Sequence, residues 1–212
     1  LHALTARMNR SAALTTALTR FASQGYNRHM LLTSTLVELR LMREEDLPML
    51  HEWLNRPHIV EWWGNERPSM DEVRAKYLPR VLAAERVTPY IALLDGRPFA
   101  YAQSYVALGS GDGWWEEVTD PGVRGIDQSI ADETLLGQGL GTRLVQALVQ
   151  RLLRDPAVTT VQTDPAPDNA RAIRCYEKAG FRRVKDIVTP DGPATYMLCG
   201  RQALAGSVNP AA

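Results

Sequence analysis

A turn with three glycines, residues 136–142 (Leu-Gly-Gln-Gly-Leu-Gly-Thr), has the residue types and spacing that point most directly to chemistry. It joins an expected strand, residues 122–130, to a helix that begins at Leu140. Glycine lets backbone N–H groups approach a ligand closely, and a helix N-terminus favours negative charge. The turn therefore predicts a cradle for a phosphate or pyrophosphate, although a glycine-rich connection without a ligand would have the same letters. The phosphate-binding loop and dinucleotide patterns are both absent, which disfavours those two nucleotide-binding folds.

An acidic, aromatic stretch precedes this turn. Between residues 112 and 133 there are seven acidic residues against Arg124 alone, and the same stretch contains Trp114 and Trp115. Carboxylates and aromatic faces together suit a cationic partner, whereas the alternative is a solvated acidic loop. Two adjacent tryptophans in a glycine-flanked loop cannot easily both face the interior, so we do not expect both to be core residues.

The composition limits the classes of protein that the chain can belong to. With 212 residues, 45% of them hydrophobic and 23% charged, it is long enough for one ordinary globular domain. Equal numbers of basic and acidic residues, 24 of each, give no indication of nucleic-acid binding. No apolar run approaches the ~20 residues that span a membrane. Cys175 and Cys199 form no disulfide framework or metal motif, so we expect a cytoplasmic protein without a catalytic metal.

Residues 1–34 differ from the rest of the chain because they mix Ala, Leu, Thr, Ser and Arg without the hydrophobic block of a secretory signal. We expect this leader to be peripheral, and partly helical or partly disordered. The domain is expected at residues 35–200, followed by a short tail at residues 201–212.

Periodicity and turn residues predict the elements that position these side chains. Asp46 is expected to cap a helix, Ser69 and Glu72 have capping-box spacing, and Asp95-Gly96 is a strong hairpin signal. The expected strands are residues 36–41, 88–94, 98–106, 122–130, 158–164, 181–188 and 194–199. The expected helices are residues 46–54, 58–62, 69–84, a central helix from residue 140 that stops at Asp155-Pro156, and residues 168–179. This order predicts a mixed α/β arrangement around one sheet, without internal repeats.

This order, with a glycine turn before the central helix, resembles the GNAT superfamily of acetyl-CoA-dependent N-acetyltransferases. The family turn Gln/Arg-x-x-Gly-x-Gly/Ala, which wraps the coenzyme A pyrophosphate, matches here except that Leu136 replaces the polar first residue. Residues 169–181 are similar to the family helix N-x-x-A-x-x-x-Y-x-K-x-G-F. The resemblance implies an α/β (α+β) GNAT fold, in which helices flank a central, mixed, mostly antiparallel twisted sheet. It also implies acetyl-CoA as cosubstrate, bound by Gln138, Gly139, Leu140, Gly141, Thr142 and Asn169.

Within the superfamily the chain resembles the aminoglycoside 6'-N-acetyltransferases. The matching stretches are residues 58–64, 88–92, 101–116, 120–129 and 162–165. The resemblance covers about residues 35–200 and implies direct transfer of acetyl to the 6'-amine of an aminoglycoside, which confers antibiotic resistance.

Two residues match the catalytic groups of that family. Asp127 corresponds to the general base, and the alternation of strand residues places it on one sheet face close to the glycine turn. An ion pair with Arg124 is the alternative role. Gly125 in the same strand predicts a bulge or a close backbone approach, where a main-chain N–H could polarise the thioester carbonyl. Tyr176 corresponds to the acid that protonates the thiolate, with a plain core tyrosine as the alternative. Asn169 matches a pantetheine contact, and a helix cap would account for it equally well.

The resemblance also assigns a substrate site of carboxylates and flat side chains. Its expected members are Trp63, Gln103, Asp112, Trp114, Trp115, Asp164 and Asp191. Family variants that also acetylate fluoroquinolones carry other residues at the positions of Trp114 and Asp191, so we expect aminoglycosides only. A GNAT enzyme for another amine, such as a siderophore precursor or a protein N-terminus, and a non-catalytic coenzyme A module are the alternatives. The preferred drugs, and whether the protein is a monomer or a dimer, stay open.

Overall fold

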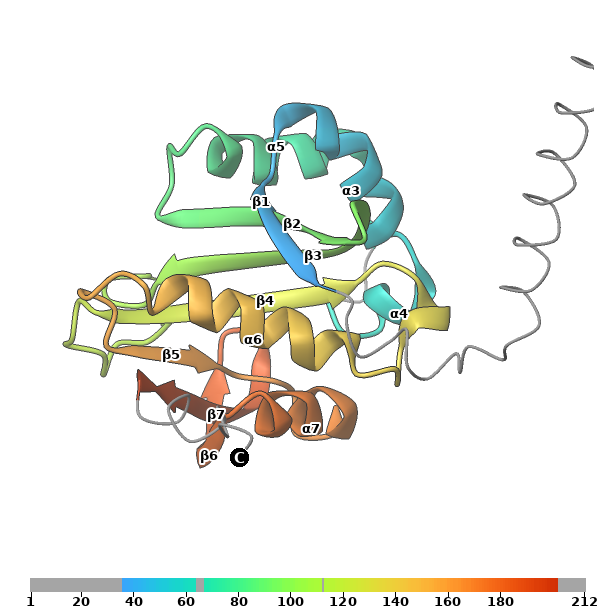
Figure 1. The fold of residues 1–212 in the computed structure, drawn as a ribbon. Coiled ribbons are helices and arrows are strands. Elements are labelled where there is room, and N and C mark those ends of the chain that lie inside the picture. The colour runs from blue at the N-terminus through green and yellow to red at the C-terminus, as the bar shows by residue number, and fades with distance from the viewer. Residues whose placement is uncertain (1–35, 64–66, 112, 202–212) are drawn as a thin grey trace, which may run out of the picture. The chain divides into compact units, whose positions relative to one another are not determined.

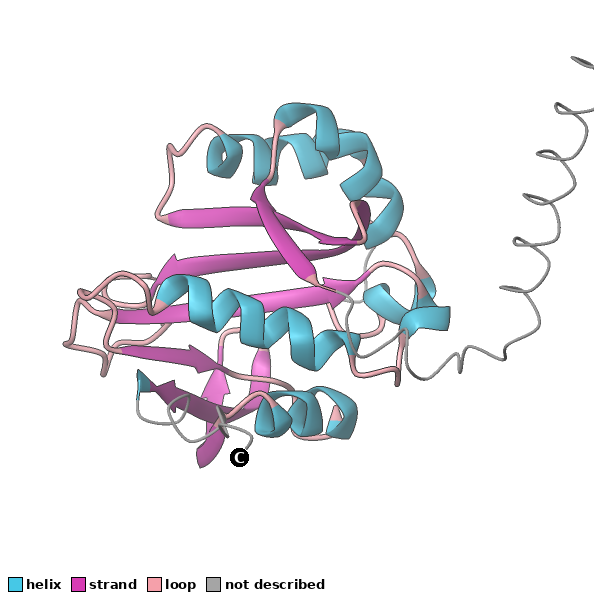
Figure 2. Cartoon of the chain, in the orientation of Figure 1, coloured by secondary structure: helices cyan, strands magenta, loops and turns pink. Residues whose placement is uncertain are grey.

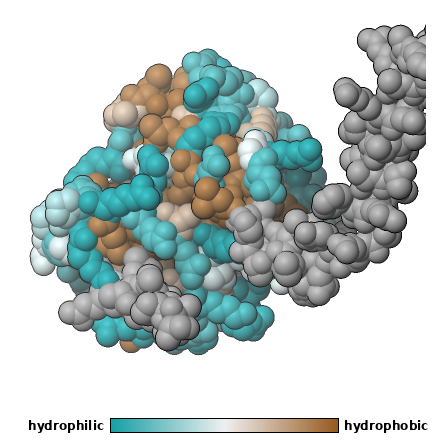
Figure 3. Space-filling model, viewed as in Figure 1, coloured by the Kyte–Doolittle hydropathy of each residue, from teal (hydrophilic) through white to brown (hydrophobic). Residues whose placement is uncertain are grey.

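The computed structural model describes residues 36–63, 67–111 and 113–201, and these belong, apart from Leu36, to one compact unit, Val37–Ala212. The leader at residues 1–34 and the tail beyond residue 201 lie outside the described residues, so the expectations for them stay predictions. No helix among the described residues is long and apolar enough to cross a membrane. In the view of Figure 3, hydrophilic residues cover much of the described surface, with hydrophobic patches between them.

The elements follow the expected order, with two short 3-10 helices added (Figure 1). In chain order they are β1 (Val37–Leu41), η1 (Glu44–Asp46), α3 (Leu47–Leu54), α4 (Pro57–Val60), α5 (Met70–Val81), β2 (Val87–Leu94), β3 (Arg97–Val106), β4 (Val123–Ile130), η2 (Glu133–Leu135), α6 (Leu140–Leu152), β5 (Thr160–Thr163), α7 (Ala170–Lys178), β6 (Arg182–Thr189) and β7 (Gly192–Gly200). The element boundaries differ from the expected ones by a few residues at most.

Seven strands form one sheet in the order β1-β2-β3-β4-β5-β7-β6. Every neighbouring pair is antiparallel except β4 and β5, which run parallel. The predicted mixed, mostly antiparallel sheet is therefore confirmed. The hairpin between β2 and β3 turns at Asp95 and Gly96, which both have positive φ angles (50° and 75°), as a tight primed turn requires.

Helices cover both faces of this sheet (Figure 2). The central helix α6 and helix α7 bury their apolar stripes against one face, where Leu144, Leu148 and Ile173 are fully buried. Helices α3 and α5 bury theirs against the other face, around Ile91 and Tyr101. Helices α3 and α5 pack on the strands at the β1 end of the sheet. They leave β4, β5 and β7 uncovered on that face, so a site can lie there.

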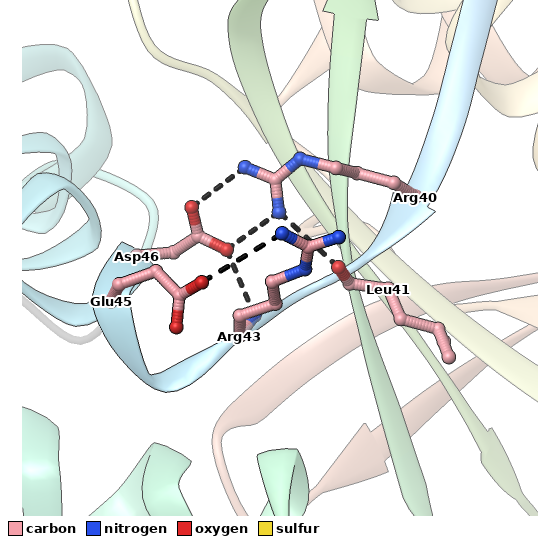
Figure 4. Close-up of polar contacts among 5 residues, drawn as sticks. All are labelled: Arg40, Leu41, Arg43, Glu45 and Asp46. Carbon is pink, nitrogen blue, oxygen red and sulfur yellow. Dashed lines mark hydrogen bonds and ion pairs between the residues drawn. The ribbon is translucent and has the colours of Figure 1, made fainter.

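The position expected for Asp46 was correct, but its side chain has another role. It stands at the N-cap position of α3, but its side chain makes no capping hydrogen bond. Instead both carboxylate oxygens accept hydrogen bonds from the Arg40 guanidinium at 2.6 Å, and one also accepts from the N–H of Arg43 at 2.8 Å (Figure 4). Burial opposes ionisation of this carboxyl, but the hydrogen bonds from Arg40 and Arg43 outweigh it, so the pKa of Asp46 lies below its usual value. The sequence did not reveal that β1 supplies the partner. The capping box of Ser69 and Glu72 on α5 was correct.

Candidate active site

The two parallel strands at the centre of the sheet, β4 and β5, separate near Asp127. Pairing between β4 and β5 extends from Val123↔Thr160 only to Gly125↔Gln162. Strand β5 ends at Thr163, whereas β4 continues for five residues beyond Gly125, to Ile130. The far half of β4 therefore has no strand neighbour on that side, and its backbone borders an open gap.

A cleft of about 340 Å³ occupies this gap. Gln128, Ser129 and Ile130 of β4 form one wall, and the N-terminal ends of α6 and α7 form another. Four of the six residues predicted to hold the coenzyme line it, namely Gly139, Gly141, Thr142 and Asn169. The structure therefore brings the glycine turn and the Asn169 helix to one place, although they are about thirty residues apart in the sequence.

The glycines of the turn serve different purposes. Gly139 is the N-cap of α6 and has a φ of 79°, a left-handed conformation that few other residues adopt. The first N–H groups of α6 have no carbonyl partner within the helix and lie at its positive end. Gly141 has an ordinary φ, but a Cβ there would lie 3.1 Å from the Cys175 sulfur. It therefore also lets α6 approach α7 closely.

The other two predicted turn residues keep their side chains away from the cleft. Leu140 is only 2% exposed and belongs to the core, and the Gln138 amide donates to the carbonyl of Thr134 at 2.7 Å. Only their backbone groups are available to an anion. Leu136 lines the cleft and packs against the core, which accounts for an apolar residue where the family pattern has a polar one.

Three cations on α7 face this cleft and were missed in the sequence. Arg171, Arg174 and Lys178 all line it, and their spacing of three and four residues places them on one side of the helix. That spacing was visible in the sequence and could have identified them. Together with the helix ends they form a wall suited to a polyanion such as a diphosphate.

Tyr176 lies on the buried side of the same helix. It is 5% exposed, and its ring packs edge-on against Phe181 at 5.3 Å between centroids. Burial raises the pKa of its hydroxyl well above the usual value, although a hydrogen bond with Thr163 opposes that shift. Tyr176 is thus a core residue whose hydroxyl lies at the end of β5, and the two roles considered for it are compatible. Asn169 is likewise both a helix cap, accepting from the N–H of Ala172 at 3.0 Å, and a cleft residue.

Asp127 lies half-buried on β4, directly opposite Gln103 of β3, whose amide Nε2 donates to its carboxylate at 2.6 Å. Burial raises the pKa of Asp127, and the bond from Gln103 and the charges of Arg80 and Lys76 oppose that shift. The ion pair considered with Arg124 is absent, because that guanidinium donates to the carbonyls of Pro121 and Val123. Asp127 therefore keeps a basic, partly desolvated carboxylate.

Two further carboxylates lie within electrostatic reach of Asp127. Asp164 follows β5, and Asp191 is exposed in the turn between β6 and β7. Burial, and then the charges of Asp127 and Asp191, raise the pKa of Asp164 to about 8. With this pKa Asp164 is largely protonated at neutral pH, and a cation bound among the three groups would lower the pKa and favour its ionised form. Asp112 lies outside the described residues, so its assignment stays a prediction.

The loop that contains Trp114 and Trp115, residues 113–121, is the tryptophan loop, and side-chain contacts hold it at the same end of the sheet. The Trp115 indole N–H donates to the Tyr105 hydroxyl at 3.1 Å, and its ring lies 5.5 Å from that of Tyr196 between centroids. Trp114 lies beside it at 5.8 Å, and both tryptophans are half-buried, as expected for residues outside the core. An ion pair of 2.7 Å between Glu117 and Lys185 ties the loop to β6.

Of the two alternatives expected at Gly125, the bulge is absent, because the β3–β4 register continues through it without a shift. The close approach is real but comes from a side chain: a Cβ on Gly125 would lie 2.0 Å from Cζ of Tyr105, the residue opposite. Gly125 is also paired with Gln162 of β5. The backbone that borders the cleft is therefore farther along β4, and the N–H role expected for Gly125 has no support.

Trp63 contacts both the cleft and Tyr101 of β3. It lines the cleft with the glycine turn, and its ring packs edge-on against Tyr101 at 5.8 Å between centroids. His58 and Trp62 line the same wall, and His58 Nε2 is hydrogen bonded with the carbonyl of Ile130 at 3.0 Å. Neither residue was singled out as a site residue in the sequence. Within the described ranges, no three His, Cys, Asp or Glu side chains are grouped as metal ligands.

Comparisons with known proteins agree with this geometry. A family model described as an acetyltransferase (GNAT) domain matches residues 42–189. The aminoglycoside N(6')-acetyltransferase type 1 of Klebsiella pneumoniae is 64% identical over 183 residues, which cover 84% of this chain and 91% of that protein. The structure of AAC(6')-Ib in complex with paromomycin and acetyl-CoA is 65% identical, with a TM-score of 0.79 over 83% of this chain and 99% of that one. The structure of AAC(6')-Ib with coenzyme A and kanamycin is 65% identical, with a TM-score of 0.78 over 82% and 99% of the two chains.

Proposed function

Because the chain belongs to the aminoglycoside N(6')-acetyltransferases of the GNAT superfamily, we propose that Asp127, Tyr176 and the cleft beside β4 carry out that reaction here. The protein transfers the acetyl group of acetyl-CoA to the 6'-amine of aminoglycosides, and this modification confers resistance. The single observation that carries the residue assignment is the parting of β4 and β5. The half of β4 beyond this point carries Asp127 and borders the cleft with the glycine turn, which supports the assignment.

The cleft is suited to acetyl-CoA. Its cationic wall on α7 and the free N–H groups of α6 would bind the diphosphate, and the open backbone of β4 would pair with the amides of the pantetheine arm. This arrangement directs the thioester toward the point where the strands separate. Asp127 on β4 and the Tyr176 hydroxyl, bonded to Thr163, flank that point.

The carboxylates bind the amine first and accept its proton afterwards. An ammonium group of the drug would be held between Asp164 and Asp191, with Trp114 and Trp115 against the sugar rings. One proton of the reacting ammonium group leaves to solvent, and the lone pair that this frees forms the C–N bond as the C–S bond breaks. Asp127 takes the second proton from the nitrogen as the amide forms, and later releases it to solvent. Tyr176 donates its proton to the departing thiolate and is reprotonated from solvent.

The same site argues against the alternative acceptors. Three mutually repelling carboxylates and two aromatic rings suit a substrate with several ammonium groups, whereas a single peptide amine would use only part of them. A non-catalytic coenzyme A module would have no use for the basic carboxylate of Asp127. The two separated free cysteines are consistent with a cytoplasmic location, which we include in the proposal.

Thiol release from acetyl-CoA tests the function directly. We expect rapid release with kanamycin, and only background release with a peptide amine, with ciprofloxacin or without acceptor, because Trp114 and Asp191 are both retained. The assay follows free coenzyme A, and mass spectrometry locates the acetyl group on the drug. Release that does not depend on kanamycin, or a ciprofloxacin rate comparable with the kanamycin rate, would contradict the proposal.

Removing the Tyr176 hydroxyl tests the proposed acid. Tyr176→Phe keeps the ring against Phe181, so we expect the fold to be retained and kcat to fall about 10- to 100-fold. The loss should be smaller with an acyl donor whose thiol is more acidic, since that thiolate needs no proton to leave. Tyr90→Phe, a buried sheet tyrosine on the α6 side, is the matched control. An equal loss with both donors would show that the hydroxyl only supports the structure.

A further inference from the structure

The side-chain amide of Gln103 lies at the centre of a hydrogen-bond network that includes Asp127. Its Oε1 accepts from the Tyr101 hydroxyl at 2.8 Å and from the Arg80 guanidinium at 3.0 Å. Its Nε2 donates to Asp127 at 2.6 Å. The network joins α5, β3 and β4, which are distant from one another in the sequence.

The partners of Gln103 determine which way its amide points. A guanidinium can only donate hydrogen bonds, so the atom that faces Arg80 must be the oxygen. An ionised carboxylate can only accept, so the atom that faces Asp127 must be the nitrogen. Rotating the amide by 180° would set its nitrogen against the guanidinium and its oxygen against the carboxylate. The Arg80 guanidinium therefore opposes this rotation, and the hydrogen bond from the Tyr101 hydroxyl adds a second contact that holds Oε1 in this orientation.

Both donors are themselves held in place. The ring of Tyr101 is fully buried and packs edge-on against Tyr77 at 5.6 Å between centroids. The Arg80 guanidinium lies over the Tyr77 ring at 5.1 Å and forms an ion pair with the exposed Glu85 at 3.1 Å. That ion pair offsets the charge of a cation that would otherwise repel a polycationic drug nearby.

We propose that Arg80 and Tyr101 are positioning residues, which orient the Gln103 amide so that it holds the Asp127 carboxylate in place for proton transfer. This inference rests on the proposed base role of Asp127 and extends it to α5 and β3. Neither residue touches the reacting atoms, and each acts through Gln103. The orientation is set before the substrate binds, which reduces the reorganisation needed during the reaction.

The charges around Asp127 give the direction of the expected effects. Arg80 and Lys76 of α5 and the Gln103 bond favour the ionised form of Asp127, whereas burial and the charge of Asp191 raise its pKa. The hydroxyls of Tyr77, Tyr101, Tyr105 and Tyr176 and the carboxyl of Asp164 face the same centre. Loss of Arg80 or of the orienting hydroxyl should therefore raise the pKa of Asp127.

The test compares Arg80→Met and Tyr101→Phe with the wild-type protein, using kanamycin and acetyl-CoA. We expect kcat/KM at neutral pH to fall about three- to tenfold, the range expected for one lost hydrogen bond. Since the base must be ionised, the acidic limb of the pH profile should move upward by roughly 0.5–1 pH unit. Carbon-13 NMR titration of the Asp127 carboxyl without substrates should show the same upward shift, independently of activity.

Matched controls separate positioning from structural effects. Tyr90→Phe removes a hydroxyl elsewhere in the sheet and should retain the wild-type acidic limb. Arg80→Lys keeps the charge and a donor, so its acidic limb should lie between those of the wild type and Arg80→Met. If the wild-type protein acetylates kanamycin, but a variant shows neither a moved acidic limb nor a shifted Asp127 titration, the assignment of the residue replaced in that variant would be overturned. Absence of wild-type kanamycin activity would instead overturn the proposed function.

Discussion

Replacing Asp127 by asparagine is expected to lower kcat for kanamycin about 10²- to 10³-fold, with a much smaller change in KM. Asparagine has nearly the same shape and can still accept the hydrogen bond from Gln103, but it cannot take a proton from the attacking amine. Drug binding is proposed to rest mainly on the other carboxylates, so it should largely persist. Steady-state kinetics with thiol detection measures both parameters.

The comparison with Asp191→Asn makes this prediction specific. That exposed carboxyl in the β6–β7 turn is proposed to bind an ammonium group, so its loss should raise KM and leave kcat nearly unchanged. Asp71→Asn, at the start of α5, controls for the loss of one surface charge. If Asp127→Asn mainly raised KM, Asp127 would be a binding carboxylate and another group would have to be the base.

The pH dependence of the wild-type enzyme follows from the same group. Burial raises the pKa of Asp127, so kcat/KM should fall as the pH drops through a value above that of an ordinary aspartate. A bound ammonium group stabilises the ionised form, so the acidic limb of kcat should lie at lower pH than that of kcat/KM.

The sequence was sufficient where the signals were local. The Asp95-Gly96 hairpin, the Ser69 capping box and the helical period that begins at Leu140 each depend on neighbours in the chain, and each prediction was confirmed. The glycine turn was found in the same way. Its association with α7 came from the family pattern, and the structure shows that association as a shared cleft.

Contacts between distant segments could not be predicted from the sequence. The partner of Asp46 is on β1, and Arg80 on α5 reaches β3 across 23 residues of chain. Gly125 predicted close contact, but only the β3–β4 register identifies Tyr105 as the residue involved. Such pairs depend on sheet register and helix placement, which a single sequence does not specify.

Replacing Gly125 by alanine is expected to destabilise the fold by ~2–3 kcal/mol and to raise KM for kanamycin roughly tenfold. The new methyl group would lie 2.0 Å from Cζ and 2.4 Å from the hydroxyl oxygen of Tyr105, so the ring must move. Moving the ring removes the acceptor for the Trp115 indole N–H and loosens the tryptophan loop. Denaturant unfolding and steady-state kinetics measure the two effects.

A double-mutant cycle identifies the cause of the destabilisation. In a Tyr105→Ala background the methyl group meets no ring, so Gly125→Ala should cost little further stability, while the loop effect on KM should persist. Tyr105→Phe alone keeps the ring beside Gly125 but lacks the hydroxyl that accepts from Trp115, and should raise KM without the large loss of stability. Gly200→Ala, where a Cβ would meet nothing within 4 Å, is the matched glycine control on β7. Equal destabilisation by Gly125→Ala with and without the Tyr105 ring would show that backbone strain, rather than this contact, requires the glycine.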